Sequence, residues 1–445
     1  MDPTRTDVRD LTDEVGPYLV PTLFVAHDRR SAFVGDRLLL SGPLVLGREG
    51  IAWPEVLDDT LISREHCRIF RRKGELYVQD LESRNGTSVN GNRLGQSEHR
   101  LKIGDVIGVG ELMLVVGQTT PREAPMADCD LVGVSRGLAM VVESVASVAP
   151  HASTVLVLGE PGVGKELIAR QVHKWSGRTG RLITVDCGAL GDGVMKSELF
   201  GHRKGAFTGA DTERIGLVEA AHEGTLFLDE IGNAPAGLQT ALLRLLQEGE
   251  IRRLGDNHSR RVDVRFICAT NADLDAMVGD GEFRLDLLTR LRRWVIDVPP
   301  LCQRREDICV LAMHLAARYA GRPIVLSGPL SLALLLHDWP GNIRELDAII
   351  ERAVISARGA SSLALTAALQ ADLSKARGGA ASGPKGGADA NRMVRPSRQA
   401  LVERMFDCNF QMSSLARELG IGRSTLYRWI AEMDIDVATL RERGP

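Results

Sequence analysis

The sequence predicts a multidomain protein: an N-terminal β-sandwich, a central α/β domain with a helical region after it, and a C-terminal all-α domain. Three observations predict this order. Short apolar runs separated by turn residues fill residues 18–117, as in antiparallel sandwiches. An apolar strand at 155–158 runs into a glycine-rich loop and a helical stretch, which begins a parallel α/β unit. Near the end of the sequence, two helical stretches flank a glycine turn.

Length, composition and charge restrict the class of protein. The 445 residues are enough for about three domains, and 44% hydrophobic with 25% charged residues is ordinary for globular proteins. A net charge of -3 gives no overall positive field, so contact with nucleic acid needs a local patch. Seven scattered cysteines without a CxxC pair indicate reduced thiols rather than disulfides or a zinc site. The start of the sequence has no apolar signal region, and no apolar run reaches membrane length. We therefore expect a cytoplasmic protein with no membrane association.

Three loop clusters in residues 18–117 combine residue types that suit a phosphate group. They are Gly47-Arg48, then Ser63-Arg64-Glu65-His66, then Ser83-Arg84-Asn85-Gly86-Thr87 leading to Asn90-Gly91. An arginine fork, a hydroxyl and an amide on separate loops could bind one phosphate. Asn-Gly pairs by themselves would only make hairpin turns, which explains Asn90-Gly91 but not the ordered set of three clusters.

With these clusters, the segment resembles a forkhead-associated (FHA) domain, a reader of phosphothreonine peptides. The resemblance implies that Arg48, Ser63 and Asn85 hold the phosphopeptide, with Arg64 and Arg84 close by. Family members often have a small residue where Arg84 stands, so the preference for neighbouring peptide residues stays open. Residues 118–130 contain two prolines and little apolar content, which predicts a linker.

Two sequence patterns in the central region together predict the two halves of an ATP site. The strand at 155–158 is followed by Gly159, Glu160, Pro161, Gly162, Val163, Gly164, Lys165 and Glu166. In a P-loop of this kind, backbone N–H groups hold the phosphates and Lys165 reaches the β/γ oxygens. The second half is Thr225–Leu228 followed by Asp229 and Glu230, where Asp229 would hold Mg²⁺ and Glu230 would orient the attacking water. A solvated edge strand is the alternative for this second half.

Three arginines and one asparagine complete the predicted catalytic set. Asn271 ends a third strand, 264–270, and would lie beside the γ-phosphate if the strands are neighbours. Arg284 and Arg290 lie on a helical stretch and could be surface charges, but an ATPase needs positive charge at its transition state, often from a neighbouring subunit. Asn342 followed by Glu345 predicts a capped helix start that places Arg344 in the first turn, near a nucleotide; a surface salt bridge is the alternative.

Between the two halves lies a loop composed of Gly205, Ala206, Phe207, Thr208, Gly209 and Ala210. A glycine at each end permits a tight turn with Phe207 and Thr208 near its tip. An exposed phenylalanine is costly unless a partner binds it. The alternative is a turn whose Phe207 folds back into the core.

Residues 131–365 resemble the AAA+ domain of sigma-54-dependent transcriptional activators, with an α/β core at 131–300 and a helical lid at 301–365. The resemblance implies that the 205–210 loop contacts sigma-54, that Arg284 and Arg290 act in trans, and that Asn271 and Arg344 sense the nucleotide. It also makes Glu166 the expected residue after Lys165. Two departures stand out. Asp186 occupies a position where the family often has an Asn that pairs with Glu230, and two such acids would repel unless one is protonated or salt-bridged. Residues 300–304 differ from the family pattern in what we expect to be surface variation.

The C-terminal region predicts a flexible linker and a small helical domain. Residues 366–395 form the linker, rich in Gly, Ala, Ser and Lys from 374 onward, and residues 396–440 form the domain. Leu401 and Met405 share one helix face. The segment resembles a Fis-type helix-turn-helix; a three-helix dimerisation module is the alternative. The residues expected to contact DNA are Arg423, Ser424, Thr425, Tyr427 and Arg428.

Together these features predict an ATP- and Mg²⁺-dependent transcription activator that forms a homo-oligomeric ring, expected to be a hexamer. Its expected partners are the sigma-54 RNA polymerase holoenzyme, double-stranded DNA at upstream sites, and a phosphothreonine protein or kinase. Two alternatives remain. An AAA+ chaperone-like remodeller would not need residues 205–210 or the C-terminal domain. A non-catalytic, phosphopeptide-responsive DNA-binding regulator would not need the intact set of Lys165, Asp229 and Glu230.

Overall fold

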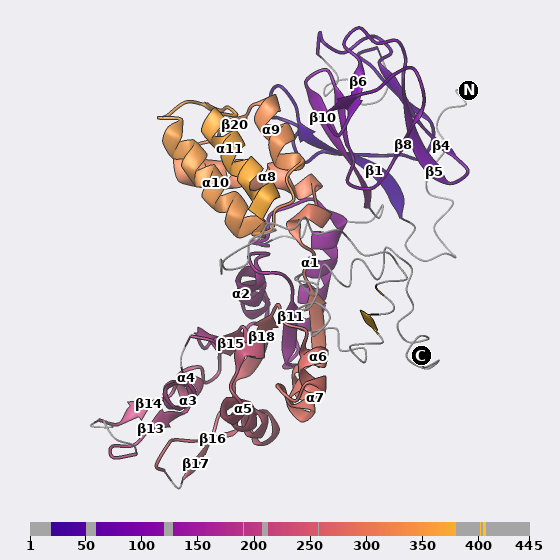
Figure 1. Ribbon diagram of the computed structural model, residues 1–445. Coiled ribbons are helices and arrows are strands. Elements are labelled where there is room, and N and C mark those ends of the chain that lie inside the picture. The colour runs from indigo at the N-terminus through magenta and orange to yellow at the C-terminus, as the bar shows by residue number, and fades with distance from the viewer. Residues whose placement is uncertain are drawn as a thin grey trace. The chain divides into compact units, whose positions relative to one another are not determined.

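The computed structural model describes residues 19–49, 59–119, 128–189, 191–206, 212–256 and 258–379, together with Leu401, Arg404 and Met405. The chain divides into two compact units, residues 1–381 and residues 382–445. The first unit contains a β-sandwich, an α/β domain and a group of helices (Figure 1). In the described part of the chain, no helix has the length and apolar character needed to cross a membrane.

The N-terminal domain is the β-sandwich that the sequence predicts. Its described strands form two antiparallel sheets, ordered β2-β1-β10-β9-β6-β7 and β3-β4-β5-β8. Apolar side chains such as Leu23, Ile69 and Leu114 are fully buried between the sheets. The strands are β1 (Val20–His27), β2 (Arg37–Leu39), β3 (Leu44–Leu46), β4 (Cys67–Arg72), β5 (Glu75–Asp80), β6 (Thr87–Val89), β7 (Asn92–Arg93), β8 (His99–Leu101), β9 (Val106–Val109) and β10 (Leu112–Thr119).

The central domain contains a parallel sheet in the order β12-β15-β18-β11-β19, which confirms the predicted α/β class. Parallel strands share their carboxyl ends, so the glycine-rich loop after β11 and the acids at the end of β15 lie at one edge. The strands are β11 (Val155–Leu158), β12 (Leu182–Asp186), β15 (Thr225–Asp229), β18 (Arg265–Thr270) and β19 (Trp294–Asp297). The helices around them are α1 (Arg136–Val148), α2 (Lys165–Trp175), α5 (Ala236–Glu248), α6 (Leu274–Gly279) and α7 (Leu285–Leu291).

Two short hairpins extend from the α/β domain at its far end from the helical group (Figure 1). One pairs β13 (Gly201–His202) with β14 (Arg214–Ile215), between α3 (Asp192–Phe200) and α4 (Leu217–Ala220). The other pairs β16 (Glu250–Arg252) with β17 (Ser259–Arg261). A β-bridge between His202 and Leu254 joins the two hairpins.

The helical lid follows the α/β domain. Its elements are η3 (Leu301–Gln303), α8 (Glu306–Ala320), β20 (Val325–Leu326), α9 (Gly328–Leu335), α10 (Asn342–Ser356), β21 (Ser362–Leu363) and α11 (Ala367–Gly379). The expected flexible linker from 366 is wrong over its first part, because α11 occupies it. Leu369 and Leu373 of α11 bury their side chains in the lid core, so the helix gains packing that composition alone does not reveal.

The expectation of surface variation at residues 300–304 is also wrong in part. Leu301 is fully buried and Arg304 is only 2% exposed, whereas Cys302 and Gln303 are exposed. The segment forms the 3-10 helix η3, which buries Leu301, and Arg304 follows it as the C-cap residue. Because Arg304 is charged and buried, we expect its guanidinium to contact a specific group in the interior.

Little of the C-terminal unit belongs to the described residues. Leu401, Arg404 and Met405 are helical, and Leu401 and Met405 are fully buried, consistent with the predicted shared face. The predicted DNA-contacting residues lie outside the described residues. They are Arg423, Ser424, Thr425, Tyr427 and Arg428.

Candidate functional site

The glycine-rich loop between β11 and α2 forms a cradle of backbone N–H groups. Gly162 and Gly164 have φ values of 80° and 103°, in the left-handed region that favours glycine. No side chain caps the N-terminus of α2, so its first N–H groups stay available to an anion. Lys165 is 7% exposed, and its Nζ donates to the Gly159 carbonyl at 3.0 Å and lies 3.4 Å from Glu230 Oε1. The Lys165 ammonium therefore lies where the phosphate groups of a nucleotide would bind.

Two acids at the end of β15 face this loop. Glu230 has a φ of 48°, a left-handed conformation that costs about 1 kcal/mol or more for a residue with a side chain. Such strain is common at functional sites. Burial raises the pKa of Asp229, and the negative charges of Glu230 and Asp186 act in the same direction. A cation bound beside Asp229 would therefore stabilise its charged carboxylate.

A cavity of about 420 Å³ is lined by residues from both halves of the predicted ATP site. Its lining includes the loop from Pro161 to Glu166, both acids and Arg344 of α10, so the structure unites most of the predicted nucleotide site. Lid residues Leu311, Leu315 and Ile343 supply apolar walls. An apolar pocket with a phosphate cradle at one end fits a nucleotide. Asn271, just after β18, is exposed and is not part of this lining.

The residues present fit a nucleotide-borne Mg²⁺. Among the described residues there is no cluster of three His, Cys, Asp or Glu side chains that could hold a metal by themselves. Magnesium at a phosphate site needs only one or two carboxylates, because phosphates and waters complete its shell. Asp229, half-buried at the cavity, could supply the protein ligand.

Arg304 also lines the cavity, although the sequence did not single it out. Its Nη2 donates to the carbonyl of Val163 inside the glycine-rich loop at 3.1 Å. Its Nε is buried and has no hydrogen-bond partner. Arg304 and Val163 are 141 positions apart in the sequence, so their contact could not be predicted before the fold was known.

The start of α10 differs from the predicted cap. The N-cap residue is Gly341, without a side-chain cap, and Glu345 Oε2 accepts from Gly341 N at 2.9 Å. Asn342 is instead fully buried with a φ of 52°. Its side chain accepts from Leu301 N at 2.7 Å and donates to Glu160 Oε2 at 3.0 Å. Asn342 therefore ties the lid to the glycine-rich loop instead of capping a helix.

Arg284 and Arg290 lie away from this cavity, in a separate hollow of about 610 Å³ beside α7. Arg284 is the N-cap residue of α7, and its guanidinium is held by Asp286. The structure therefore does not bring these two arginines to the nucleotide cavity of their own chain, and their action in trans stays a prediction.

Asp186 lies directly across from Asp229, because β12 and β15 pair in that register. Its Oδ1 accepts from Gly188 N at 2.8 Å, which holds the carboxylate in its own turn. The expected repulsion between Asp186 and Glu230 stays a prediction; the neighbour that the charge of Asp186 affects is Asp229, whose pKa it helps to raise.

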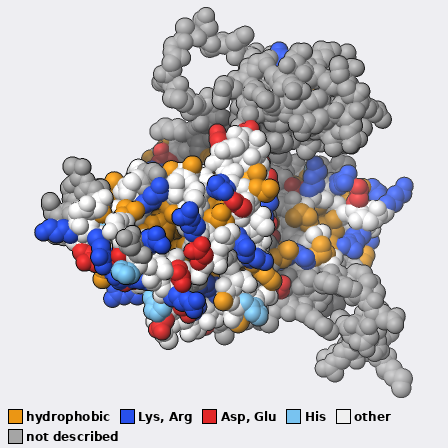
Figure 2. All heavy atoms as spheres, turned by 90° about the horizontal axis from the view of Figure 1, so that it is seen from below, with side chains coloured by type: hydrophobic (Ala, Val, Ile, Leu, Met, Phe, Trp, Pro, Cys, Tyr) orange, Lys and Arg blue, Asp and Glu red, His pale blue; other side chains and the backbone are white. Residues whose placement is uncertain are grey.

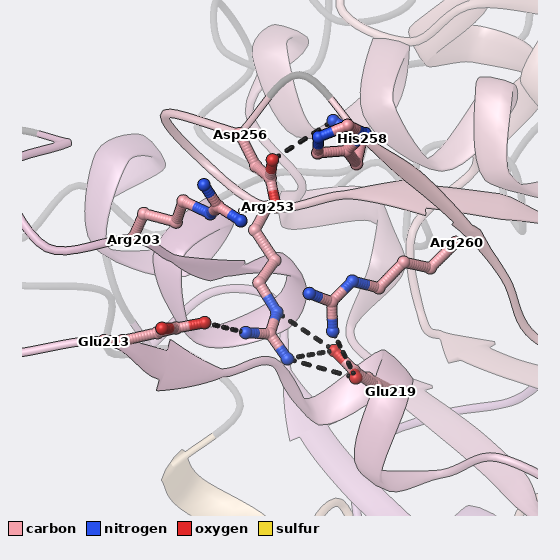
Figure 3. Close-up of polar contacts among 7 residues, drawn as sticks. All are labelled: Arg203, Glu213, Glu219, Arg253, Asp256, His258 and Arg260. Atoms are coloured by element: carbon pink, nitrogen blue, oxygen red, sulfur yellow. Dashed lines mark hydrogen bonds and ion pairs between the residues drawn. The ribbon is translucent and has the colours of Figure 1, made fainter.

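Several ion pairs surround the base of the hairpin that carries the loop beginning at Gly205 (Figure 3). Arg253 of the second hairpin is 5% exposed; its guanidinium binds Glu219 Oε2 at 2.8 Å and pairs with Glu213. Asp256 holds Arg203 on the other side of the stem, with Nε–Oδ2 at 3.1 Å. The network fixes the two hairpins to each other, so movement of one would carry the other.

Of the six predicted loop residues, Gly205 and Ala206 are described, and Phe207, Thr208, Gly209 and Ala210 lie outside the described residues. Gly205 has a φ of 82°, which fits the expected tight turn. Seen from below, the face of the molecule that carries the hairpins is rich in Lys and Arg side chains (Figure 2). Exposed basic residues of the hairpins include Lys204, Arg252 and Arg261.

A second candidate site lies on the β-sandwich. A hollow of about 1170 Å³ is lined by Arg48, Ser63, Arg64 and Arg84, among other residues. Ser63 Oγ accepts from Arg84 N at 3.0 Å, and Asn85 Nδ2 donates to the Leu61 carbonyl at 2.7 Å. The structure therefore brings the predicted phosphopeptide residues onto adjacent loops, with Asn85 beside the hollow rather than in its lining.

Buried polar residues fix these loops. His66 is fully buried and accepts from Ser63 N through Nδ1 at 3.1 Å, while its Nε2 lies 3.2 Å from the Gly86 carbonyl. At Gly47, an added Cβ would lie 2.1 Å from the Arg64 carbonyl oxygen, so only glycine permits this approach. Burial alone would raise the pKa of Asp80, but hydrogen bonds from Thr87 and Ser83 outweigh it and lower that pKa.

Comparisons with known proteins agree with this arrangement. Residues 131–297 match the family model described as Sigma-54 interaction domain, residues 44–110 match FHA domain, and residues 302–383 match AAA+ ATPase lid domain. The chain is 42% identical over 322 residues to the transcriptional regulatory protein ZraR of Klebsiella oxytoca, covering 70% of each chain. It is 49% identical over 235 residues to the formate hydrogenlyase transcriptional activator FhlA of Escherichia coli, covering 52% of this chain and 34% of that one.

Solved structures give a similar result. The crystal structure of NtrX from Brucella abortus in complex with ATP has a TM-score of 0.50 and 31% identity, covering 69% of each chain. The structure of the same protein in complex with ADP has a TM-score of 0.51 and 32% identity, covering 69% of this chain and 70% of that chain.

Proposed function

The chain belongs to the sigma-54-dependent transcriptional activator family, and we propose that it hydrolyses ATP to remodel the sigma-54 RNA polymerase holoenzyme and open promoters. The observation that carries the proposal is the cavity between the α/β domain and the lid, where Lys165, Asp229, Glu230 and Arg344 converge. The ATP and ADP in the NtrX structures support a nucleotide there.

Each residue has a role in the proposed hydrolysis. The loop N–H groups and Lys165 bind the phosphates, and Glu230 orients the attacking water. A bound Mg²⁺, held by Asp229, would neutralise charge on the phosphates. Asn271 and Arg344 respond to the nucleotide state, and Arg284 and Arg290 reach the cavity of a neighbouring subunit. We therefore propose a ring, with six subunits expected.

The output and input surfaces follow from the same proposal. The loop 205–210 contacts sigma-54, and the network around Arg253 transmits movement of the core to that loop. The C-terminal domain, residues 396–440, binds upstream DNA through residues 423–428, and the chain acts in the cytoplasm, where polymerase and DNA are found. The FHA domain binds a phosphothreonine protein through Arg48, Ser63 and Asn85, with Arg64 and Arg84 close by.

Paired measurement of ATP turnover and promoter opening tests the proposal. The purified full chain is mixed with sigma-54 holoenzyme, a sigma-54 promoter with upstream sequence, ATP and Mg²⁺, and strand separation is mapped by permanganate reactivity. We expect ATP-dependent opening by the parent chain and none by Lys165→Ala. Opening without ATP, or ATP turnover without any opening, would contradict the proposal.

A further inference from the structure

The segment between α9 and α10 packs its backbone directly on the glycine-rich loop. We name residues 339–342 the lid turn. A Cβ at Gly162 would lie 2.3 Å from the Gly341 carbonyl oxygen, so the two backbones meet with no side chain between them. The N–H of Ile343, the residue after the lid turn, donates to the Gly162 carbonyl at 3.0 Å. The lid turn therefore helps to set the conformation of Gly162 inside the predicted phosphate cradle.

Two residues of the lid turn have an unfavourable backbone conformation. Trp339 and Asn342 have φ values of 54° and 52°, in the left-handed region that residues with a Cβ rarely adopt. Both side chains are fully buried, and Trp339 Nε1 donates to the Leu334 carbonyl at 3.0 Å. A strained backbone of this kind persists only where the surrounding contacts determine it. The lid turn therefore depends on side chains that hold it in place.

Glu345, in the first turn of α10, is one of these side chains. Its Oε2 accepts from Gly341 N at 2.9 Å, and its Oε1 lies 3.0 Å from His337 Nε2. A Cβ at Gly341 would lie 2.8 Å from the Glu345 Cβ, so a side chain at position 341 would displace Glu345 from the backbone. One carboxylate thus joins the lid turn to the residue that precedes it by two positions.

The imidazole of His337 fixes the direction of the Glu345 carboxylate. It is 1% exposed and meets the Trp339 ring edge to face, with the ring centroids 4.6 Å apart. Its Nδ1 is buried and has no hydrogen-bond partner among the described residues. Because a carboxylate oxygen can only accept, Nε2 donates to Glu345. The polar contact of this buried ring is therefore directed at Glu345.

Glu345 and His337 lie behind the nucleotide cavity. The described residues that line the cavity include Ile343 and Arg344 but neither Glu345 nor His337. An effect of Glu345 on a bound nucleotide would therefore act through the lid turn and the loop that it contacts. An acid in the first turn of a helix also stabilises that helix through its dipole. A purely structural role in α10 is thus the alternative that an experiment has to separate.

We propose that Glu345, oriented by His337, is a positioning residue for nucleotide binding. It fixes the lid turn against Gly162 and so keeps the glycine-rich loop in the conformation that binds the phosphates. A loop that adopts this conformation only part of the time binds a nucleotide more weakly, in proportion to that fraction. The proposal rests on the proposed ATPase function and deepens it, because it assigns part of the nucleotide affinity to residues outside the cavity.

Three variants of the full chain test this, with ADP as the probe so that binding is measured without hydrolysis. Glu345→Ala removes both hydrogen bonds. Glu345→Gln keeps an oxygen that accepts from Gly341 N, and its amide can donate to His337 Nε2 once the ring proton moves to Nδ1. His337→Phe keeps an aromatic ring beside Trp339 but loses the hydrogen bond to Glu345. Glu351→Ala is the matched control, because Glu351 is an exposed acid on the same helix.

We expect Glu345→Ala to weaken ADP binding about tenfold and each of the other two variants about threefold, while the control keeps the parent affinity. The anisotropy of a fluorescent ADP gives these affinities, and thermal unfolding establishes that each variant folds. The KM for ATP should rise in the same order. In contrast, kcat at saturating ATP should stay near the parent value, because bound nucleotide restores the loop conformation.

Parent affinity for ADP in a folded Glu345→Ala variant would overturn the inference. Equal losses in Glu345→Ala and Glu345→Gln would also overturn it, because the charge in the first helix turn would then matter and the hydrogen bonds would not. If Glu345→Ala does not fold, His337→Phe decides: weaker ADP binding supports the inference, and parent affinity overturns it. A parent chain that binds ADP but does not hydrolyse ATP would contradict the proposed function instead, and the ADP affinities would still decide the inference.

Discussion

The carboxylate of Asp286 holds the guanidinium of Arg284 at two points within one subunit, with Nη2 2.7 Å from Oδ2 and Nε 3.0 Å from Oδ1. Both side chains are close to half exposed. Exposed ion pairs contribute little to stability, so an incoming phosphate could displace Asp286. Arg284 is thus paired in its own subunit and available to a neighbour.

Mixing two inactive variants should therefore restore some ATP turnover. Lys165→Ala subunits cannot bind the phosphates but supply Arg284, and Arg284→Ala subunits bind ATP but lack the arginine. Loss of such an arginine costs about 10³-fold or more in rate. We expect each variant alone to be nearly inactive and mixtures to reach a maximum at intermediate ratios, measured as phosphate release. Mixtures that never exceed the sum of the two separate rates would place the arginine within its own active site.

The sequence predicted the phosphate cradle and the two acids because their geometry is local. A strand, a glycine-rich loop and a helix start are contiguous residues, and Asp229-Glu230 simply ends a strand. Short apolar runs also predicted the β-sandwich and the parallel sheet of the central domain. What links these local elements to the lid was not predicted, since the contact of Arg304 with Val163 and that of Asn342 with Glu160 join positions far apart in the sequence.

Two further differences have physical reasons. Helix α11 begins inside the expected linker, because Leu369 and Leu373 bury their side chains against the lid and offset its weak helical pattern. Asn342 looked like a helix cap, since Asn followed by Glu three residues later is a common start signal. In the fold its amide is used by the lid and the glycine-rich loop, and Gly341 takes the cap position.

Arg48→Ala should weaken binding of phosphothreonine peptides to the full chain. Removing a charged hydrogen-bond partner costs about 2 kcal/mol, which corresponds to roughly 30-fold in affinity. A phosphothreonine peptide library identifies a binding peptide, and fluorescence anisotropy gives the dissociation constants. The control is Arg68→Ala, because Arg68 is an exposed FHA arginine that lies over the Phe70 ring outside the hollow. Equal affinities for Arg48→Ala and the parent would mean that the phosphate binds elsewhere.

Glu306→Gln should remove one component of the pH dependence of unfolding. Burial raises the pKa of Glu306 from 4.5 to about 7, and the charge of Asp307 acts in the same direction, while that of Arg304 opposes it. Because the folded pKa is the higher one, the stabilising contribution is complete below pH 4.5 and is lost as the pH rises towards 7. The gap, at about 1.4 kcal/mol for each pH unit, corresponds to about 3 kcal/mol.

The measurement is the thermal unfolding midpoint of the first unit between pH 5 and 8. We expect the parent to lose stability relative to Glu306→Gln as the pH rises, and the difference to level off above pH 7. Glu351→Gln, at an exposed position on α10, is the control and should follow the parent. A constant difference between Glu306→Gln and the parent across this range would show that Glu306 does not titrate in it.

The last prediction concerns Thr208, near the expected tip of the loop that begins at Gly205. Thr208 is far in sequence from every residue that lines the nucleotide cavity, so Thr208→Ala should hydrolyse ATP at nearly the parent rate. If the loop transmits movement to sigma-54, the same variant should fail to open a sigma-54 promoter. Thr212→Ala is the matched control, since Thr212 is exposed on the return of the same hairpin.

Phe207→Ala separates this idea from a packing role for the loop. A phenylalanine in the core would cost about 3–5 kcal/mol on truncation to alanine, and it would lower ATP turnover and promoter opening together. A phenylalanine that contacts sigma-54 would leave the unfolding midpoint and the ATP turnover unchanged and abolish only the opening. ATP turnover, promoter opening and the unfolding midpoint are therefore measured on one preparation of each variant. Promoter opening at the parent rate by both Thr208→Ala and Phe207→Ala would show that the loop is not needed for opening. The ionic network around Arg253 would then have no contact with sigma-54 to which it could transmit movement.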